Sequence, residues 1–127
     1  MEHHPIFSQF DTGSFEKTPG MVVDFVGARF RTRFNSREDP NDVSHPPRFC
    51  EEYFEWIDML ESVASALGKY RMIELGAGFG RWTVRSVLAA RKWGIADIKT
   101  ISVEAEPAHA SWMRTAFDDN GLLGDNH

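Results

Sequence analysis

The sequence predicts an α/β fold built around one βαβ unit, and three stretches of the chain carry this prediction. A buried strand at residues 73–75 runs into a glycine-rich turn, GAGFG, at residues 76–80. Residues 81–92 (RWTVRSVLAARK) then place apolar side chains at helical spacing, and Gly94 follows as a stop signal. Residues 98–103 (IKTISV) form a β-rich stretch. A strand, a helix and a second strand in this order predict parallel strands joined by a right-handed crossover.

An N-terminal extension, residues 1–48, is expected to contain a β-hairpin and a proline-rich linker. Residues 1–19 show no steady period and are expected to form loop. Residues 20–34 (GMVVDFVGARFRTRF) alternate in places between apolar and polar side chains, which predicts the hairpin. Residues 35–47 (NSREDPNDVSHPP) contain three prolines and are expected to form the linker.

The second half of this hairpin carries three alternating arginines, Arg29, Arg31 and Arg33, after an expected turn at residues 26–28. We interpret the hairpin as a structural element that packs onto the rest of the chain, with the arginines in solvent. The alternative is that the three guanidinium groups form an anion-binding face for an acidic ligand.

Residues 49–67 are the clearest helix, because apolar side chains recur at steps of three and four residues and Gly68 follows as a stop. The predicted apolar stripe contains Tyr53, Trp56, Ile57, Leu60, Val63, Ala64 and Leu67. We expect this stripe to pack against the sheet. The alternative is that Tyr53 or Glu55 reaches over a ligand as a lid.

Composition and charge exclude several classes of function. The 127 residues suit one domain, and 14 basic against 19 acidic residues give a net charge of −5 without a basic stripe, which disfavours a nucleic-acid partner. The single cysteine, Cys50, excludes an intrachain disulfide and favours a reducing compartment. Because no apolar run is long enough for a membrane span and no signal-peptide core is present, we expect a cytoplasmic protein with no membrane partner. The histidines, including His3 and His4 in an expected disordered terminus, show no metal-ligand spacing.

The glycine-rich turn holds the residues from which function can be argued. Three glycines alternate at Gly76, Gly78 and Gly80, which lets the backbone bend sharply and lets a ligand approach it. The helix that follows is expected to point free N–H groups at the turn. The dinucleotide-binding fingerprint G-x-G-x-x-G requires its third glycine one residue later, where this chain has Arg81. An acid, Glu104, lies 24 residues beyond Gly80, close to where such folds place the carboxylate that binds a ribose diol.

Three stretches resemble the FkbM family of class I S-adenosylmethionine-dependent methyltransferases. They are residues 74–82 (ELGAGFGRW), 103–107 (VEAEP) and 112–122 (WMRTAFDDNGL), and the resemblance covers roughly residues 50–124. It implies a Rossmann-like methyltransferase fold, S-adenosylmethionine as cofactor, and methyl transfer to a hydroxyl group of a small molecule or sugar. The acceptor itself does not follow from it.

The resemblance also implies which residues bind the cofactor. The turn would contact the methionine end, Glu74 would orient the turn or the cofactor's ammonium group, and Glu104 would accept the ribose hydroxyls, with Glu106 as the alternative acid. Either acid could instead be a solvated carboxylate at a helix N-terminus. The full expected set is Glu74, Gly76, Ala77, Gly78, Phe79, Gly80, Glu104, Ala105 and Glu106. No residue of the chain is identified as the catalytic base.

Residues 49–127 are expected to be only the N-terminal half of such a cofactor-binding domain, because five residues remain after the helix stop at Asn120-Gly121-Leu122. We interpret the chain as the N-terminal portion of a methyltransferase that is inactive alone, with unpaired sheet edges that favour self-association. Two alternatives stay open: a fragment of an NAD-dependent oxidoreductase, and a non-catalytic remnant or assembly module of the methyltransferase fold.

Overall fold

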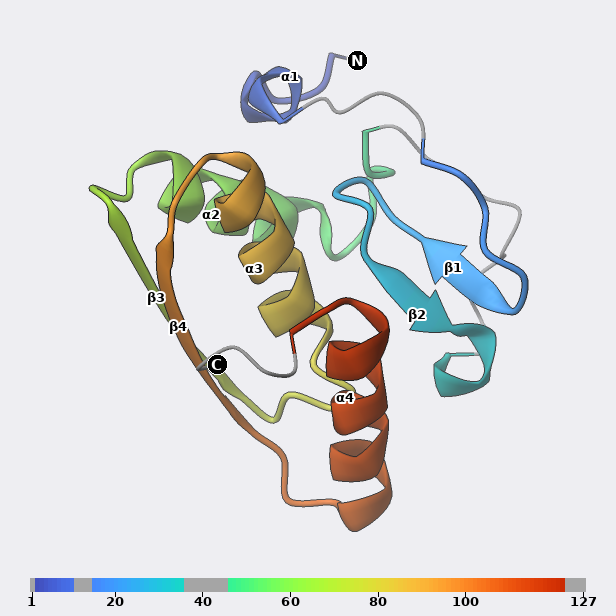
Figure 1. The fold of residues 1–127 in the computed structure, drawn as a ribbon. Helices are drawn as coiled ribbons and strands as arrows, with labels where there is room; N and C mark the ends of the chain where they lie inside the picture. The colour runs from blue at the N-terminus through green and yellow to red at the C-terminus, as the bar shows by residue number, and fades with distance from the viewer. Residues whose placement is uncertain (1, 11–14, 36–45, 123–127) are drawn as a thin grey trace.

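Two separate two-stranded sheets and the helices packed beside them give the chain a mixed α/β architecture (Figure 1). The structure is a computed structural model that describes residues 2–10, 15–35 and 46–122. The elements follow in this order: α1 (Ile6–Gln9), β1 (Met21–Val23), β2 (Arg29–Arg31), the 3-10 helix η1 (Thr32–Phe34), α2 (Tyr53–Ala64), β3 (Lys69–Leu75), α3 (Arg81–Lys92), β4 (Asp97–Val103) and α4 (Pro107–Asp119). Most of the expected linker lies outside the described residues, and the division of the chain at residue 48 stays a prediction.

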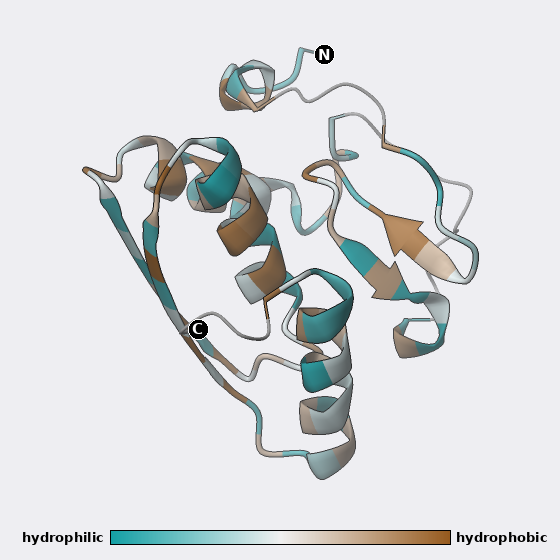
Figure 2. Cartoon of the chain, viewed as in Figure 1, coloured by the Kyte–Doolittle hydropathy of each residue, from teal (hydrophilic) through white to brown (hydrophobic). Residues whose placement is uncertain are grey.

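The predicted strand–helix–strand order is confirmed, because β3 and β4 pair in parallel with α3 between them in the sequence. The register runs from Lys69 opposite Asp97 to Leu75 opposite Val103. Both strands begin earlier than predicted, β3 at Lys69 and β4 at Asp97. Hydrophilic and hydrophobic residues are mixed along both strands (Figure 2), and side-chain burial alternates along most of each strand, as expected of a sheet with two different faces.

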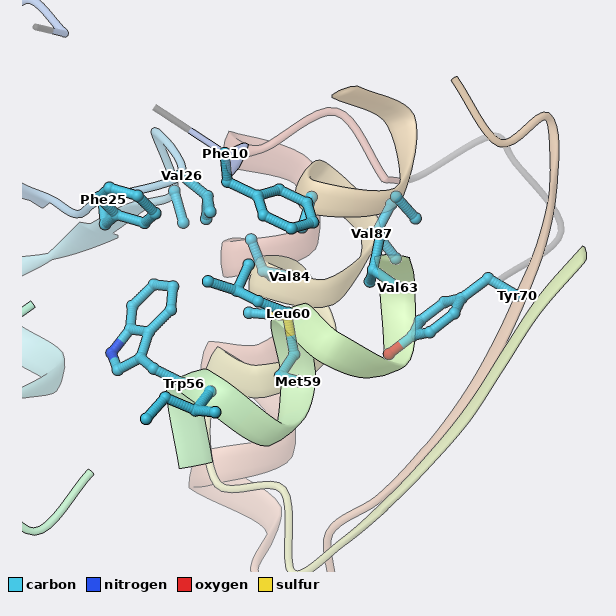
Figure 3. Close-up of a cluster of buried hydrophobic side chains, with 14 of the residues drawn as sticks. Phe10, Phe25, Val26, Trp56, Met59, Leu60, Val63, Tyr70, Val84 and Val87 are labelled. Atoms are coloured by element: carbon cyan, nitrogen blue, oxygen red, sulfur yellow. The ribbon is translucent and has the colours of Figure 1, made fainter. Parts of the chain in front are cut away.

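The hydrophobic core lies between α2, α3 and the N-terminal segment (Figure 3). The predicted stripe is buried from Tyr53 to Val63, and so is Met59, which the prediction omitted. The prediction is wrong for Leu67, which lies beyond the end of α2 and is 95 % exposed. The expectation that α2 covers the sheet needs correction, because α2 packs chiefly against α3. It meets β3 at Tyr70, whose hydroxyl lies 2.9 Å from the Ser62 hydroxyl. Small buried residues on α3, Ala89 and Ala90 among them, allow the two helices to approach closely.

The N-terminal segment is more ordered than predicted. Residues 6–9 form α1 instead of loop, and Ile6, Phe7 and Phe10 are buried in the core. The expected disorder at His3 is also wrong: its ring stacks on Phe49 at a centroid distance of 4.5 Å. The physical reason is an apolar cluster on one short turn, which gains more by burial than it loses in chain entropy.

Tyr53 belongs to this N-terminal contact as well. Its hydroxyl accepts a hydrogen bond from the backbone N–H of His4 at 2.9 Å and lies 3.2 Å from Nδ1 of His3. Because its ring is buried here, Tyr53 is a packing residue and not the lid of a ligand site. Glu55, the other candidate for a lid, is exposed.

The predicted hairpin is present, with Val22 opposite Phe30 in the antiparallel pair of β1 and β2. The alternative, in which Arg29, Arg31 and Arg33 form one face, is wrong, because the second strand ends at Arg31 and the chain then enters η1. The interpretation that the arginines lie in solvent holds for Arg33 alone, since Arg29 and Arg31 are half-buried. Arg31 pairs with Asp119 of α4 through two hydrogen bonds of 2.9 and 3.1 Å, and Arg33 lies over the Phe34 ring. A carboxylate of the distant helix α4 therefore pairs with the Arg31 guanidinium that the alternative assigned to an external anion.

A buried guanidinium joins the hairpin to the helices. Arg85 of α3 is 4 % exposed and lies between two indole rings, with Cζ 4.4 Å from the centroid of Trp56 and 4.6 Å from that of Trp82. Its Nε donates to Asp24 at 2.8 Å, and Nη1 donates to Glu52 at 3.4 Å. Burial raises the pKa of the Asp24 carboxyl, while Arg85 and two backbone N–H groups oppose this shift. The charge is therefore both paired and enclosed by aromatic faces.

One face of the β3–β4 pair is left uncovered by the residues that the structure describes. Ile73 and Leu75 are 66 % and 76 % exposed, and Ile101 and Val103 are 59 % and 49 % exposed. In parallel sheets both faces are normally buried. Self-association through this sheet stays a prediction. Within the described ranges, no helix is long and apolar enough to cross a membrane.

We predict that Arg85→Met destabilises the chain by about 3 kcal/mol or more, because it leaves the buried Asp24 carboxylate without its cation. Urea unfolding followed by circular dichroism measures this change. The matched control is Arg71→Met, which removes an exposed pair with Asp97 and should leave the free energy of unfolding nearly unchanged. The double variant Asp24→Asn/Arg85→Met should recover part of the loss. Equal losses of unfolding free energy in Arg85→Met and Arg71→Met would contradict a stabilising role of the buried pair of Arg85 and Asp24.

Candidate functional site

The glycine-rich turn lies between the end of β3 and the start of α3, at the carboxyl edge of the parallel strands (Figure 1). Two backbone hydrogen bonds define it. The Ala77 N–H donates to the Val103 carbonyl at 2.9 Å, and the Gly80 N–H donates to the Ala77 carbonyl at 2.8 Å. The first of these fastens the turn to the last residue of β4, so the turn and the segment after β4 are held side by side.

The three alternating glycines all adopt left-handed backbone angles, with φ of 66° at Gly76, 59° at Gly78 and 77° at Gly80. They differ in their surroundings. A Cβ atom at Gly76 or Gly78 would meet nothing within 4 Å, whereas one at Gly80 would lie 2.6 Å from Phe117 and 2.8 Å from Met113 of α4. The first two glycines therefore leave open space beside the backbone, and the third permits close packing against α4.

Glu74 caps α3 from the neighbouring strand. Its Oε2 accepts hydrogen bonds from the Thr83 N–H at 2.9 Å and the Thr83 hydroxyl at 2.6 Å, and its Oε1 accepts from the Trp82 N–H at 3.3 Å. The prediction of free N–H groups at this helix start is therefore wrong for Trp82 and Thr83. The N-cap residue, Gly80, has no side chain to satisfy these donors, so a carboxylate from β3 does so and also meets the positive end of the helix dipole.

The neighbouring strand completes this arrangement through Ser102 of β4, which pairs with Glu74 in the sheet. Its hydroxyl lies 2.6 Å from the Thr83 hydroxyl. Thr83 and Ser102 are the residues of the site that sequence reasoning missed. The available signal was a threonine in the first helical turn with an acid at the end of the preceding strand, a pair suited to capping.

Glu104 is brought directly to the turn. Its Oε2 accepts a hydrogen bond from the Gly78 N–H at 2.6 Å, and its Oε1 accepts from the Glu106 N–H at 2.9 Å. The backbone N–H groups of Glu106 and Gly78 favour the charged carboxylate and hold its pKa below the usual range. The Glu104 side chain is half-buried, and each of its two oxygens accepts one backbone hydrogen bond.

Glu106 has a different role. It is the N-cap of α4, and its Oε2 accepts a hydrogen bond from the His109 N–H at 2.8 Å. The backbone N–H groups of His109 and Ala108 hold the pKa of Glu106 below the usual range. This is the capping role that the sequence left open for either acid. Ala105, between the two, is exposed.

Phe79, the remaining side chain of the turn, points toward the hairpin. Its ring centroid lies 5.3 Å from that of Phe30 and 5.5 Å from that of Phe34. The site is therefore made of main-chain atoms and carboxylates. Over the described part of the chain, no group of three or more His, Cys, Asp or Glu side chains could hold a metal ion.

Lowering the pH should weaken the contact between Glu104 and the glycine turn, because the carboxylate becomes protonated. Because its folded-state pKa is lowered, the ionised carboxylate stabilises the folded chain above its unfolded-state pKa, and this contribution is lost as the pH falls through the folded-state pKa. We predict that Glu104→Gln lowers the free energy of unfolding at about pH 7 and that the difference from the unmodified chain shrinks toward about pH 3. Urea unfolding at several pH values measures it. A difference that is constant with pH would contradict this account of Glu104.

Comparison with curated proteins finds a relative in Jannaschia sp. (strain CCS1) that is named "Putative methyltransferase". The two are 27 % identical over 120 residues, which is 90 % of this chain and 43 % of the relative. The chain therefore spans less than half the length of the relative that it matches. No family model matches the chain, and no solved structure matches it.

Proposed function

We propose that the turn at residues 76–80 and Glu104 bind S-adenosylmethionine, and that the chain is part of a methyltransferase of the FkbM kind. The similarity to a protein named a methyltransferase supports this proposal, although it covers 43 % of that protein. The proposed acceptor is a hydroxyl group of a small molecule or sugar, with no nucleic-acid or membrane partner.

The observation that carries the proposal is the 2.6 Å hydrogen bond from the Gly78 N–H to Glu104. It brings together two features that lie 26 residues apart in sequence: a bend without side chains and a carboxylate of lowered pKa. A ribose diol binds well to such a carboxylate because two hydroxyl groups can donate to it. The open space at Gly76 and Gly78 leaves room for a ligand against the backbone.

The cap on α3 favours a sulfonium nucleoside over a dinucleotide. Dinucleotide-binding folds place a pyrophosphate at the N-terminus of this helix, where free N–H groups and the helix dipole stabilise it. Here Glu74 already accepts from the N–H groups of Trp82 and Thr83. A pyrophosphate would lose these donors and be repelled by the carboxylate, whereas S-adenosylmethionine has no phosphate and carries a positive sulfonium.

Each residue has a defined role in this proposal. Glu104 accepts the ribose hydroxyls, the backbone of residues 76–80 contacts the methionine end, and Glu74 orients the turn by capping α3. When bound, the cofactor supplies an activated methyl group. The chain's contribution is to bind and orient it, since positioning is the main source of rate enhancement in such a displacement. No residue of this chain is proposed as the base for the acceptor.

Isothermal titration with S-adenosylhomocysteine tests the proposal. We predict that Glu104→Gln, which keeps the shape but removes the charge and one acceptor, weakens binding about tenfold to hundredfold. Glu106→Gln is the matched control, because its carboxylate caps α4, and it should leave the affinity within about threefold of the unmodified chain.

Three other results would contradict the proposal. No heat with millimolar S-adenosylhomocysteine would indicate a non-catalytic remnant of the fold. Binding of NAD in place of S-adenosylhomocysteine would indicate the oxidoreductase alternative. Equal losses in Glu104→Gln and Glu106→Gln would remove Glu104 from the ribose site.

A further inference from the structure

The glycine turn is packed on one side by residues from the N-terminal segment. The Phe79 ring lies 5.3 Å from Phe30, in an edge-to-face arrangement, and 5.5 Å from Phe34. Phe30 is a residue of β2 and Phe34 ends η1, and both are buried. The turn therefore has an open side, at Gly76 and Gly78, and an aromatic side that the hairpin supplies.

The hairpin is itself fixed to α4 by polar contacts with good geometry. The Asn120 side chain accepts from the Arg29 N–H at 2.8 Å and donates to the Arg29 carbonyl at 2.7 Å, so it pairs with the strand as a neighbouring strand would. Arg31 makes its two hydrogen bonds to Asp119. Phe34 also stacks on Trp112 of α4 at a centroid distance of 5.2 Å.

These contacts fix the place of Phe34 relative to α4, and α4 in turn packs against the turn at Gly80. Phe79 lies between Gly78 and Gly80, which both have left-handed backbone angles. Glycine can also adopt many other backbone conformations, so these angles are not fixed by the glycines themselves. Glycine has the largest loss of conformational freedom on ordering, so a turn with three glycines needs an anchor. Phe79 is the residue of this turn whose side chain can serve as that anchor.

We propose that Phe30 and Phe34 are positioning residues for the cofactor site: by holding Phe79 they fix the Gly78 N–H against Glu104. This inference rests on the proposed function of the turn. It makes cofactor affinity depend on a segment more than 40 residues earlier in the chain, since Phe34 and Gly78 are separated by 44 positions. In this proposal the hairpin raises cofactor affinity by ordering the glycine turn, and not by presenting charged side chains to the cofactor.

The test uses Phe34→Leu, which keeps an apolar side chain but removes the ring, and Phe25→Leu as the matched control. Phe25 is a buried ring of the same segment that contacts Phe7 and Trp56. In the ligand-free chain, amide hydrogen exchange at Gly78 should be about fivefold to tenfold faster in Phe34→Leu than in Phe25→Leu, after correction for global stability. Equal exchange rates would overturn the proposal.

Phe79→Leu removes the other ring of the same contact, that of the half-buried Phe79. It replaces Phe34→Leu in the test if that variant fails to fold. It should accelerate exchange at Gly78 similarly, and the two substitutions together should add little to either one, because both remove the same contact. Additive effects would overturn the proposal. Phe34→Tyr retains an aromatic ring, so the Gly78 amide should exchange at the rate of the unmodified chain.

Titration with S-adenosylhomocysteine separates this proposal from the proposed function. If the unmodified chain binds, Phe34→Leu should weaken binding about tenfold and Phe25→Leu should not. If the unmodified chain does not bind, the proposed function fails, and the exchange comparison still decides whether the aromatic contact orders the turn.

Discussion

The burial of the Arg85 guanidinium is the constraint on which the other contacts depend. Enclosing a charge requires partners, and here they come from three parts of the chain: Asp24 after β1, Glu52 before α2, and the indoles of Trp56 and Trp82. An interior cation with one partner removed is strongly unfavourable. The hairpin, α2 and α3 are therefore held in one relative arrangement, and the packing of the hairpin beside the glycine turn follows from it.

Under the proposed function, two intramolecular anions govern which ligand the site accepts. Glu74 and Glu104 both accept backbone N–H groups, but at different ends of the same turn. Glu74 neutralises the helix start, so the region is unsuited to a phosphate. Glu104 keeps its charge at the open side, where hydroxyl donors can reach it. A chain with the same glycines but a neutral residue in place of Glu74 would have a different electrostatic preference.

Local pattern was sufficient to predict the βαβ unit and α2, because their signals lie within a few residues of one another. The glycine turn and the position of Glu104 beside it were also accessible, since β4 ends just before Glu104. The burial of Arg85 was inaccessible from local pattern, because its partner Asp24 is 61 positions away. The pairing of Arg31 was inaccessible for the same reason: Asp119 is 88 positions away, and no local period encodes that contact.

The uncovered aliphatic face of β3 and β4 has a consequence for the chain in solution. Sulfate and phosphate are excluded from protein surfaces and strengthen the tendency of such a face to be buried. The same ions screen the mutual repulsion that a net charge of −5 provides. Both effects act in one direction, so we expect kosmotropic salts to promote precipitation of this chain and dilute buffers of low ionic strength to keep it dissolved.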